Sequence, residues 1–178
     1  MKWKLALATG LTIMAACVIA GNRGLVAEDA PKVGSDPAVD RTRKQIAMLD
    51  DLYKTAVVLI TKHYVNKETD VSAGTAAQAL FDVMRKKGHH DVRLLDATGT
   101  PYDDENLPKD AFEKEAIKQL KAGKPTYEQL ESRKDGRYLR VATVVPVVSE
   151  KCVMCHEAYK KAKAGEAIGS LSYTLKVE

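Results

Sequence analysis

The chain has 178 residues, of which 45% are hydrophobic and 29% charged, enough length and apolar content for one globular domain with its own core. Its 28 basic and 24 acidic residues give a formal net charge of +4. A balance this close to neutrality does not predict a nucleic-acid-binding protein, which gathers basic residues on one surface.

The N-terminus predicts an export signal over residues 1–20. Lys2 and Lys4 supply a charged start, and residues 5–20 supply a short apolar core that ends in small residues. We expect cleavage after Ala20 or Ala27 and a periplasmic or otherwise exported mature protein. Without Lys2 and Lys4 the chain carries 26 basic against 24 acidic residues, a net charge of +2.

Two membrane-attached alternatives to a cleaved signal remain open. A retained anchor is one, but the apolar stretch is short for a bilayer-spanning helix, so no stable transmembrane anchor is expected. The second alternative is a lipid anchor through Cys17. This cysteine is the last residue of an imperfect lipobox, Met14-Ala15-Ala16-Cys17.

Residues 21–40 predict a flexible tether, because prolines, glycines and charges occur there without hydrophobic periodicity. The domain is then expected over residues 41–178. From about Val39, apolar residues recur every three or four positions, which predicts a long amphipathic helix with His63 on its buried side. The predicted stripe consists of Ile46, Leu49, Tyr53, Val57, Ile60 and the pair His63 and Tyr64.

Two further helices are predicted before the strand-rich half of the chain. One covers residues 74–87 and the other residues 109–122, and each is followed by a glycine, Gly88 or Gly123, where a left-handed cap is required. A short strand over 92–96 is predicted between them.

The second half of the chain predicts antiparallel strands. A strand near 126–132, the turn Lys134-Asp135-Gly136 and the β-branched run 137–148 form a predicted hairpin, and residues 168–177 alternate as a closing strand. Helices come first and strands last. We therefore expect an α+β domain whose antiparallel sheet of four or five strands has its helices packed on one face.

The run Cys152-Val153-Met154-Cys155-His156 lies on a short helix predicted over 149–163. Two thiols about one helical turn apart can add to the two vinyl groups of a haem, and the adjacent imidazole can bind the iron. The motif therefore predicts one covalently bound haem c, with Cys152 and Cys155 as thioether residues and His156 as the proximal iron ligand.

Three other interpretations of the motif are weaker. A thioredoxin-like redox pair belongs in a βαβ unit, which the chain does not predict. A structural zinc site requires four ligands, whereas only Cys152, Cys155 and His156 lie close together in sequence. A disulfide between the two cysteines would close a very short loop and leave His156 without a role.

The segments Val92-Arg93-Leu94-Leu95-Asp96, Tyr138-Leu139-Arg140-Val141-Ala142 and Ile168-Gly169-Ser170-Leu171-Ser172 occur in this order around the haem motif. In this arrangement the chain resembles the single-haem c-type cytochromes with a PAS-like haem-binding domain, a family long catalogued as a domain of unknown function. The resemblance covers about residues 46–177. It implies a PAS-like antiparallel sheet flanked by helices, with a long N-terminal helix.

The resemblance also implies a function, and this chain differs from similar proteins at the distal iron ligand. Similar proteins are periplasmic cytochromes or the sensing inputs of signalling proteins. They place a distal cysteine ligand on the first helix, where the mature chain has no cysteine and His63 occupies roughly the corresponding region. The resemblance then implies a bis-histidine iron, with a spectrum and potential different from those of a His/Cys relative.

Several groups are candidates for the distal iron ligand. His63 is the first candidate because an imidazole on an apolar stripe needs a partner. His90 is the alternative, whereas His89 is expected to point to the opposite side of the strand, towards solvent. An open distal position remains possible, and for the methionines and tyrosines on the helices core packing is the commoner explanation. These are Met48, Met84, Met154, Tyr53 and Tyr64.

Arg93, Arg137 and Arg140 are the candidates for pairing with the haem propionates, although charged residues on strands more often form a solvated face. The most direct functional interpretation is electron transfer by an exported monohaem cytochrome with six-coordinate iron. The alternative is a haem-based redox or gas sensor that signals to a separate partner.

An enzyme is not expected, since nothing in the chain specifies an acid/base pair. The expected partners are the cytochrome maturation machinery and either a redox donor and acceptor or a signalling partner.

Overall fold

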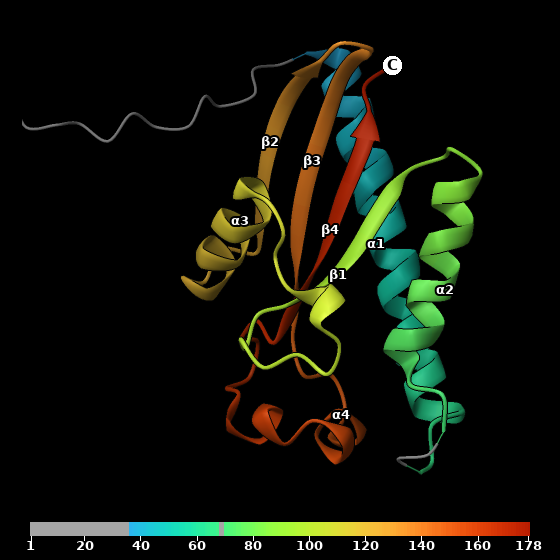
Figure 1. The fold of residues 1–178 in the computed structure, drawn as a ribbon, viewed down its shortest axis with the longest axis vertical. Coiled ribbons are helices and arrows are strands. Elements are labelled where there is room, and N and C mark those ends of the chain that lie inside the picture. The colour runs from blue at the N-terminus through green and yellow to red at the C-terminus, as the bar shows by residue number, and fades with distance from the viewer. Residues whose placement is uncertain (1–35, 68–69) are drawn as a thin grey trace, which may run out of the picture. The chain divides into compact units, whose positions relative to one another are not determined.

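The computed structural model describes residues 36–67 and 70–178, so the predicted signal, Cys17 and most of the predicted tether lie outside the described residues. The elements follow one another along the chain as predicted (Figure 1). They are α1 (Pro37–His63), α2 (Ala73–Lys86), β1 (Asp91–Asp96), the 3₁₀ turn η1 (Asp104–Asn106), α3 (Ala111–Lys121), β2 (Thr126–Arg133), β3 (Gly136–Val145), α4 (Glu150–Cys155), the 3₁₀ turn η2 (Glu157–Lys161) and β4 (Gly169–Lys176).

The strands form one four-stranded sheet in the order β1-β4-β3-β2, and each neighbouring pair is antiparallel. The predicted hairpin is confirmed, because Arg133 of β2 pairs with Gly136 of β3 across the Lys134-Asp135 turn. The last strand of the chain, β4, lies between β1 and β3. The α+β class with an antiparallel sheet flanked by helices is therefore confirmed.

Helices cover both faces of this sheet, so the expectation that they pack on one face is wrong. On one face, Leu139 and Val141 of β3 belong to a core that also includes residues of α1 and α2. On the other face, Ala142 packs in a second core with Phe112 and Ala116 of α3. Successive strand residues point to opposite faces, and β3 is apolar on both, which allows a helix on each side.

The start of α1 is fixed by a side-chain cap. Asp36 accepts a hydrogen bond from the backbone N–H of Ala38 at 2.9 Å, and Pro37 occupies the first helical turn. Val39, one turn in, is fully buried. The helix therefore begins inside the last residues of the segment predicted as a tether, four residues before the expected domain boundary at 41.

A polar contact locks α1 against the sheet. Asp50 accepts hydrogen bonds from the hydroxyls of Thr143 at 2.6 Å and Tyr173 at 3.0 Å, one on β3 and one on β4. Tyr173 is fully buried, and its burial raises its pKa, which keeps the hydroxyl a donor. Because Ile46 and Tyr53 are also buried on this side, the rotation of α1 about its axis is determined.

The predicted apolar stripe of α1 is confirmed as far as the last helical turn. There, the prediction that His63 lies on the buried side is wrong. Leu49 and Val57 pack against the core, but His63 and Tyr64 are exposed. The end of α1 runs beyond the ends of the strands towards α4, so the sheet does not cover that turn (Figure 1).

We expect Leu139→Ala to lower the free energy of unfolding by about 2–5 kcal/mol, because Leu139 is 0% exposed and its removal leaves a cavity under α1. The matched control is Leu52→Ala on the outer side of α1, where Leu52 is 60% exposed and the expected change is within about 0.5 kcal/mol. Urea denaturation followed by circular dichroism measures both. Equal losses in the two variants would contradict the described core.

Candidate functional site

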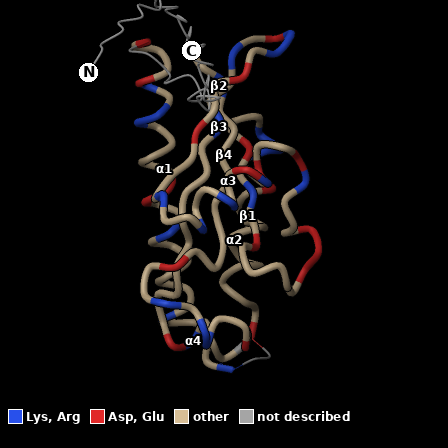
Figure 2. The backbone as a smooth tube through the Cα atoms, turned by 90° about the vertical axis from the view of Figure 1, so that its left-hand side faces the viewer, with Lys and Arg blue, Asp and Glu red and all other residues tan. Residues whose placement is uncertain are grey.

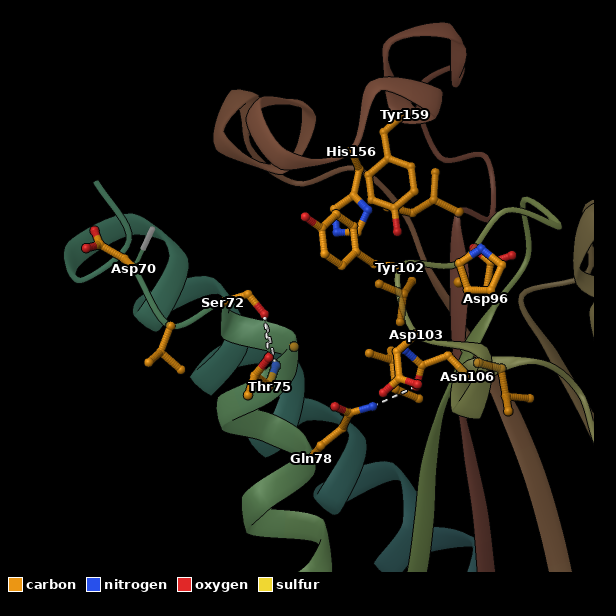
Figure 3. A pocket seen from close by; sticks show the side chains of 18 residues that line it. Asp70, Ser72, Thr75, Gln78, Asp96, Tyr102, Asp103, Asn106, His156 and Tyr159 are labelled. Carbon is orange, nitrogen blue, oxygen red and sulfur yellow. Dashed lines mark hydrogen bonds between the residues drawn. The ribbon is translucent and has the colours of Figure 1, made fainter. Parts of the chain in front are cut away.

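His156 lines a cavity of about 470 Å³ at the end of the sheet (Figure 3). The end of β1, the start of β4, the loop 101–106 and the first turns of α2 supply the other walls. Ser72, Thr75 and Gln78 form the α2 side. A space of this size lies in the range, about 300–1,000 Å³, of pockets that hold small molecules and cofactors.

A glycine permits the close approach of β4 and β1 at the cavity. Gly169, the first residue of β4, lines the cavity and pairs with Asp96. A Cβ atom at this position would lie 2.8 Å from the carbonyl oxygen of Leu95, closer than real Cβ contacts allow. Any larger residue would therefore push the two strands apart where they form the cavity wall.

Two tyrosines flank the His156 ring. Tyr159 stacks on the imidazole with ring centroids 4.4 Å apart and planes 17° apart, and Tyr102 meets it edge-on at 5.7 Å. Burial lowers the pKa of His156, opposed by the nearby charge of Asp96, and burial raises the pKa of Tyr159 to about 12. A lowered pKa favours the neutral imidazole, the form that binds metals.

The haem motif is not one continuous helix, which corrects the helix predicted over 149–163. Ser149 caps α4 by accepting from the N–H of Lys151 at 3.2 Å, and the helix ends at Cys155. His156 then adopts extended backbone angles before η2 begins. This break directs the His156 side chain into the cavity, while Cys152 is a part-buried thiol on α4.

The other histidines do not line the cavity. His63 is exposed at the end of α1, and His89 is exposed as expected. The Nε2 atom of His90 lies 2.7 Å from the hydroxyl of Tyr53, in a hydrogen bond at the start of β1. The cavity is lined by the second half of β1, Leu94 to Asp96, so about 13 Å of strand separates its nearest lining residue from His90.

The methionine and tyrosine candidates lie away from the cavity lining as well. Met48 is 64% exposed, so it does not pack in the core as its spacing suggested, and Met84 and Met154 are part-buried. Tyr53 is a core residue at 3% exposure, whereas Tyr64 is exposed.

Two of the three arginines proposed for propionates converge on a buried carboxylate. Arg93 donates to Glu113, whose side chain is 2% exposed. Arg140 lies 3.9 Å from the same carboxylate, donates to Asp110 at 2.7 Å and stacks over the ring of Phe112. These guanidinium groups therefore neutralise acidic residues of α3 and its cap.

The third arginine is far from the cavity. Arg137 lies at the start of β3 and pairs with Asp36 at 2.5 Å, whereas Val145 at the opposite end of β3 lines the cavity. Of the three arginines, Arg93 comes nearest, since it lines a smaller hollow of about 270 Å³ that shares Gln78 and Asn106 with the main cavity.

Sequence reasoning did not identify the polar wall of the cavity. Gln78 donates to the side-chain oxygen of Asn106 at 2.7 Å, which joins α2 to η1 across the cavity floor. Asp96 accepts from Thr98 and from the N–H of Gly99. The turn signal after Asp96 did predict a loop there, but a turn signal does not say which cavity the loop borders.

The helix that carries Cys152, α4, is hydrogen-bonded to the end of α1 through Lys151. The ammonium group of Lys151, next to Cys152, donates to the carbonyl oxygens of Lys62 at 3.0 Å and Val65 at 2.5 Å. The turn that follows His63 therefore lies against α4, although the His63 side chain is exposed.

The described elements carry charges of both signs. Figure 2 shows basic and acidic residues interspersed along the helices and strands. None of the helices in residues 36–67 and 70–178 has the length and hydropathy needed to cross a bilayer. Within the same residues, no three His, Cys, Asp or Glu side chains gather as a site for a free metal ion.

Comparisons with known proteins bear on the family and the fold of the chain. A family model described as Tll0287-like matches residues 38–174. The crystal structure of the cyanobacterial haem protein Tll0287 has a similar fold, with a TM-score of 0.54 and 12% sequence identity over 76% of this chain and 95% of that chain. This likeness supports a PAS-like arrangement of the sheet. No curated protein matches the chain.

We expect Glu113→Ala to lower the free energy of unfolding by about 3–5 kcal/mol, because it leaves Arg93 and Arg140 without their shared buried partner. Glu115→Ala, which removes a half-buried carboxylate that pairs with Lys118 of the same helix, is the control and should leave the denaturation midpoint nearly unchanged. If Glu113→Ala were as stable as Glu115→Ala, the two arginines would not depend on this carboxylate and would be available to another anion.

Proposed function

Since this chain belongs to the Tll0287-like family, we propose that it binds one haem c beside His156 and carries electrons outside the cytoplasm. The observation that carries the proposal is the placement of His156. It is the last residue of a Cys-x-x-Cys-His motif, and its ring borders a cavity large enough for a cofactor. The similar cyanobacterial structure is that of a haem protein.

Each motif residue has a separate task in this proposal. Cys152 and Cys155 hold the haem covalently through thioether bonds, and His156 binds the iron. The haem supplies one-electron redox chemistry. Tyr159 and Tyr102 restrict the orientation of the His156 imidazole, because one stacks on its face and the other contacts it edge-on.

We propose His63 as the distal iron ligand. The turn after His63 is hydrogen-bonded to α4 through Lys151, so the end of α1 already lies beside the haem-bearing segment. His90 is a weaker candidate because it bonds to Tyr53 at the far end of β1. Two imidazole ligands that stay bound in both oxidation states keep the reorganisation on electron transfer small.

Among the arginines, Arg93 is the one we retain for a propionate, because the hollow that it borders adjoins the cavity. Arg137 and Arg140 border neither the cavity nor this hollow, which makes them weaker candidates.

Export and maturation follow from the predicted signal over residues 1–20, with a lipid-anchored form through Cys17 as the alternative. Haem would then be attached outside the cytoplasm by the cytochrome maturation machinery. A redox donor and an acceptor complete the set of proposed partners.

A haem-based sensor is the second candidate function. The α2 wall of the cavity carries the hydroxyls of Ser72 and Thr75 and the amide of Gln78. Such groups bind iron weakly but can donate hydrogen bonds to a small iron-bound ligand. If the distal position exchanges, this wall would favour the binding of a diatomic gas.

Covalent attachment is tested by mass spectrometry of protein produced with a working cytochrome maturation system. We expect the mature chain to lack its signal and to carry the added mass of one haem, and the Cys152→Ser, Cys155→Ser double variant to lose that mass. A wild-type mature chain without the added mass would contradict the proposal.

The distal ligand is tested by the ferric spectrum. We expect the wild type to be low-spin and its ferrous form to be unchanged by carbon monoxide, whereas His63→Ala should become high-spin and bind carbon monoxide. His89→Ala, an exposed histidine, is the control and should match the wild type. A low-spin His63→Ala protein would remove His63 from the iron, and rapid carbon monoxide binding by the wild type would favour the sensor.

A further inference from the structure

We propose that Lys151 is a positioning residue, which holds the haem-bearing helix α4 against the end of α1 and thereby sets how His63 meets the iron. The inference rests on the proposed function and adds a residue that the haem motif does not include. Lys151 is part-buried, and its ammonium group points into the turn that follows α1.

The contacts of Lys151 match the chemistry of a helix end. Its Nζ donates to the carbonyl oxygens of Lys62 at 3.0 Å and Val65 at 2.5 Å and lies 3.4 Å from the side-chain oxygen of Asn66. The last carbonyls of a helix lack partners within the helix and form the negative end of its dipole. An ammonium group has three donors, so Lys151 can satisfy all three oxygens together.

A residue of the cavity wall also holds the residues that follow α1. Asp70, which lines the cavity, accepts from the N–H groups of Asn66 at 2.8 Å and Lys67 at 3.0 Å. These hydrogen bonds, and then the charge of Lys151, lower the pKa of Asp70. Val65, Asn66 and Lys67 are thus held by hydrogen bonds with Lys151 of α4 and with Asp70.

The contacts of Lys151 affect the proposed haem site because both partners adjoin residues of that site. Lys151 precedes Cys152, and Lys62 precedes His63, so each end of the Lys151–Lys62 contact is one residue from a group proposed to hold the haem. The peptide bond holds neighbouring Cα atoms about 3.8 Å apart, so a shift at either end of the contact also moves the adjacent residue. Without Lys151, α4 and the end of α1 could separate and His63 would bind the iron less completely.

Other lysines of the motif region do not make this contact. Lys160, on η2, pairs with Glu157 at 2.8 Å and is exposed. It has the same charge as Lys151 and lies only four residues beyond His156. Lys160→Ala is therefore a matched control that removes one positive charge near the haem without changing the link between α4 and α1.

The experiment compares Lys151→Ala, Lys151→Gln, Lys151→Arg and Lys160→Ala as purified holoproteins with haem attached. Loss of charge-assisted hydrogen bonds in Lys151→Ala should raise the ratio of high-spin to low-spin ferric iron about tenfold and shift the midpoint potential. Lys151→Gln, which keeps a donor without the charge, should give a smaller change. Lys151→Arg should restore the wild-type spectrum, and Lys160→Ala should not alter it.

The His63→Ala variant separates failure of this inference from failure of the proposed ligand. If His63→Ala is high-spin but Lys151→Ala keeps the wild-type spectrum and potential, the role of Lys151 is overturned and His63 remains the ligand. A lower denaturation midpoint for Lys151→Ala without a spectral change also overturns it, since the contact would then serve stability alone. A low-spin His63→Ala protein overturns both.

Discussion

The hydrogen bonds from Tyr173 and Thr143 to Asp50 hold α1 on the sheet and so set where the C-terminal end of this helix lies. They fix one point of a 27-residue helix on the sheet, and the buried residues Ile46 and Tyr53 fix its rotation. The end of α1 is about 20 Å further along the helix axis, at the rise of an α-helix. A contact in the core thus places the turn that meets the haem motif.

The cavity lies at the end of the sheet because both faces of the sheet are covered. α1 and α2 bury one face and α3 buries the other, so the remaining space is where strands end and loops begin. Gly169 lets β4 approach β1 closely there, and the extended backbone at His156 directs an imidazole into the same space. The site is therefore assembled from the ends of elements that are distant in sequence.

The buried charges of the domain stabilise its fold. Glu113 is almost completely buried and is compensated by Arg93 of β1 and Arg140 of β3, two strands that lie on either side of β4. Removing a charge from water is costly unless a partner is present, so these three groups stabilise one another. Lys151 is different, because it compensates backbone dipoles at a helix end rather than a carboxylate.

The sequence by itself determined the elements and the motif, because their signals are local. Helical periodicity, the capping glycines Gly88 and Gly123 and the spacing of the Cys152-to-His156 run all act within a few residues. Only the tertiary structure decided that α3 lies on the opposite face, that His63 is exposed and that the arginines bind carboxylates. Those outcomes depend on contacts between residues distant in sequence, such as Arg140 with Asp110, 30 positions apart, which local patterns do not encode.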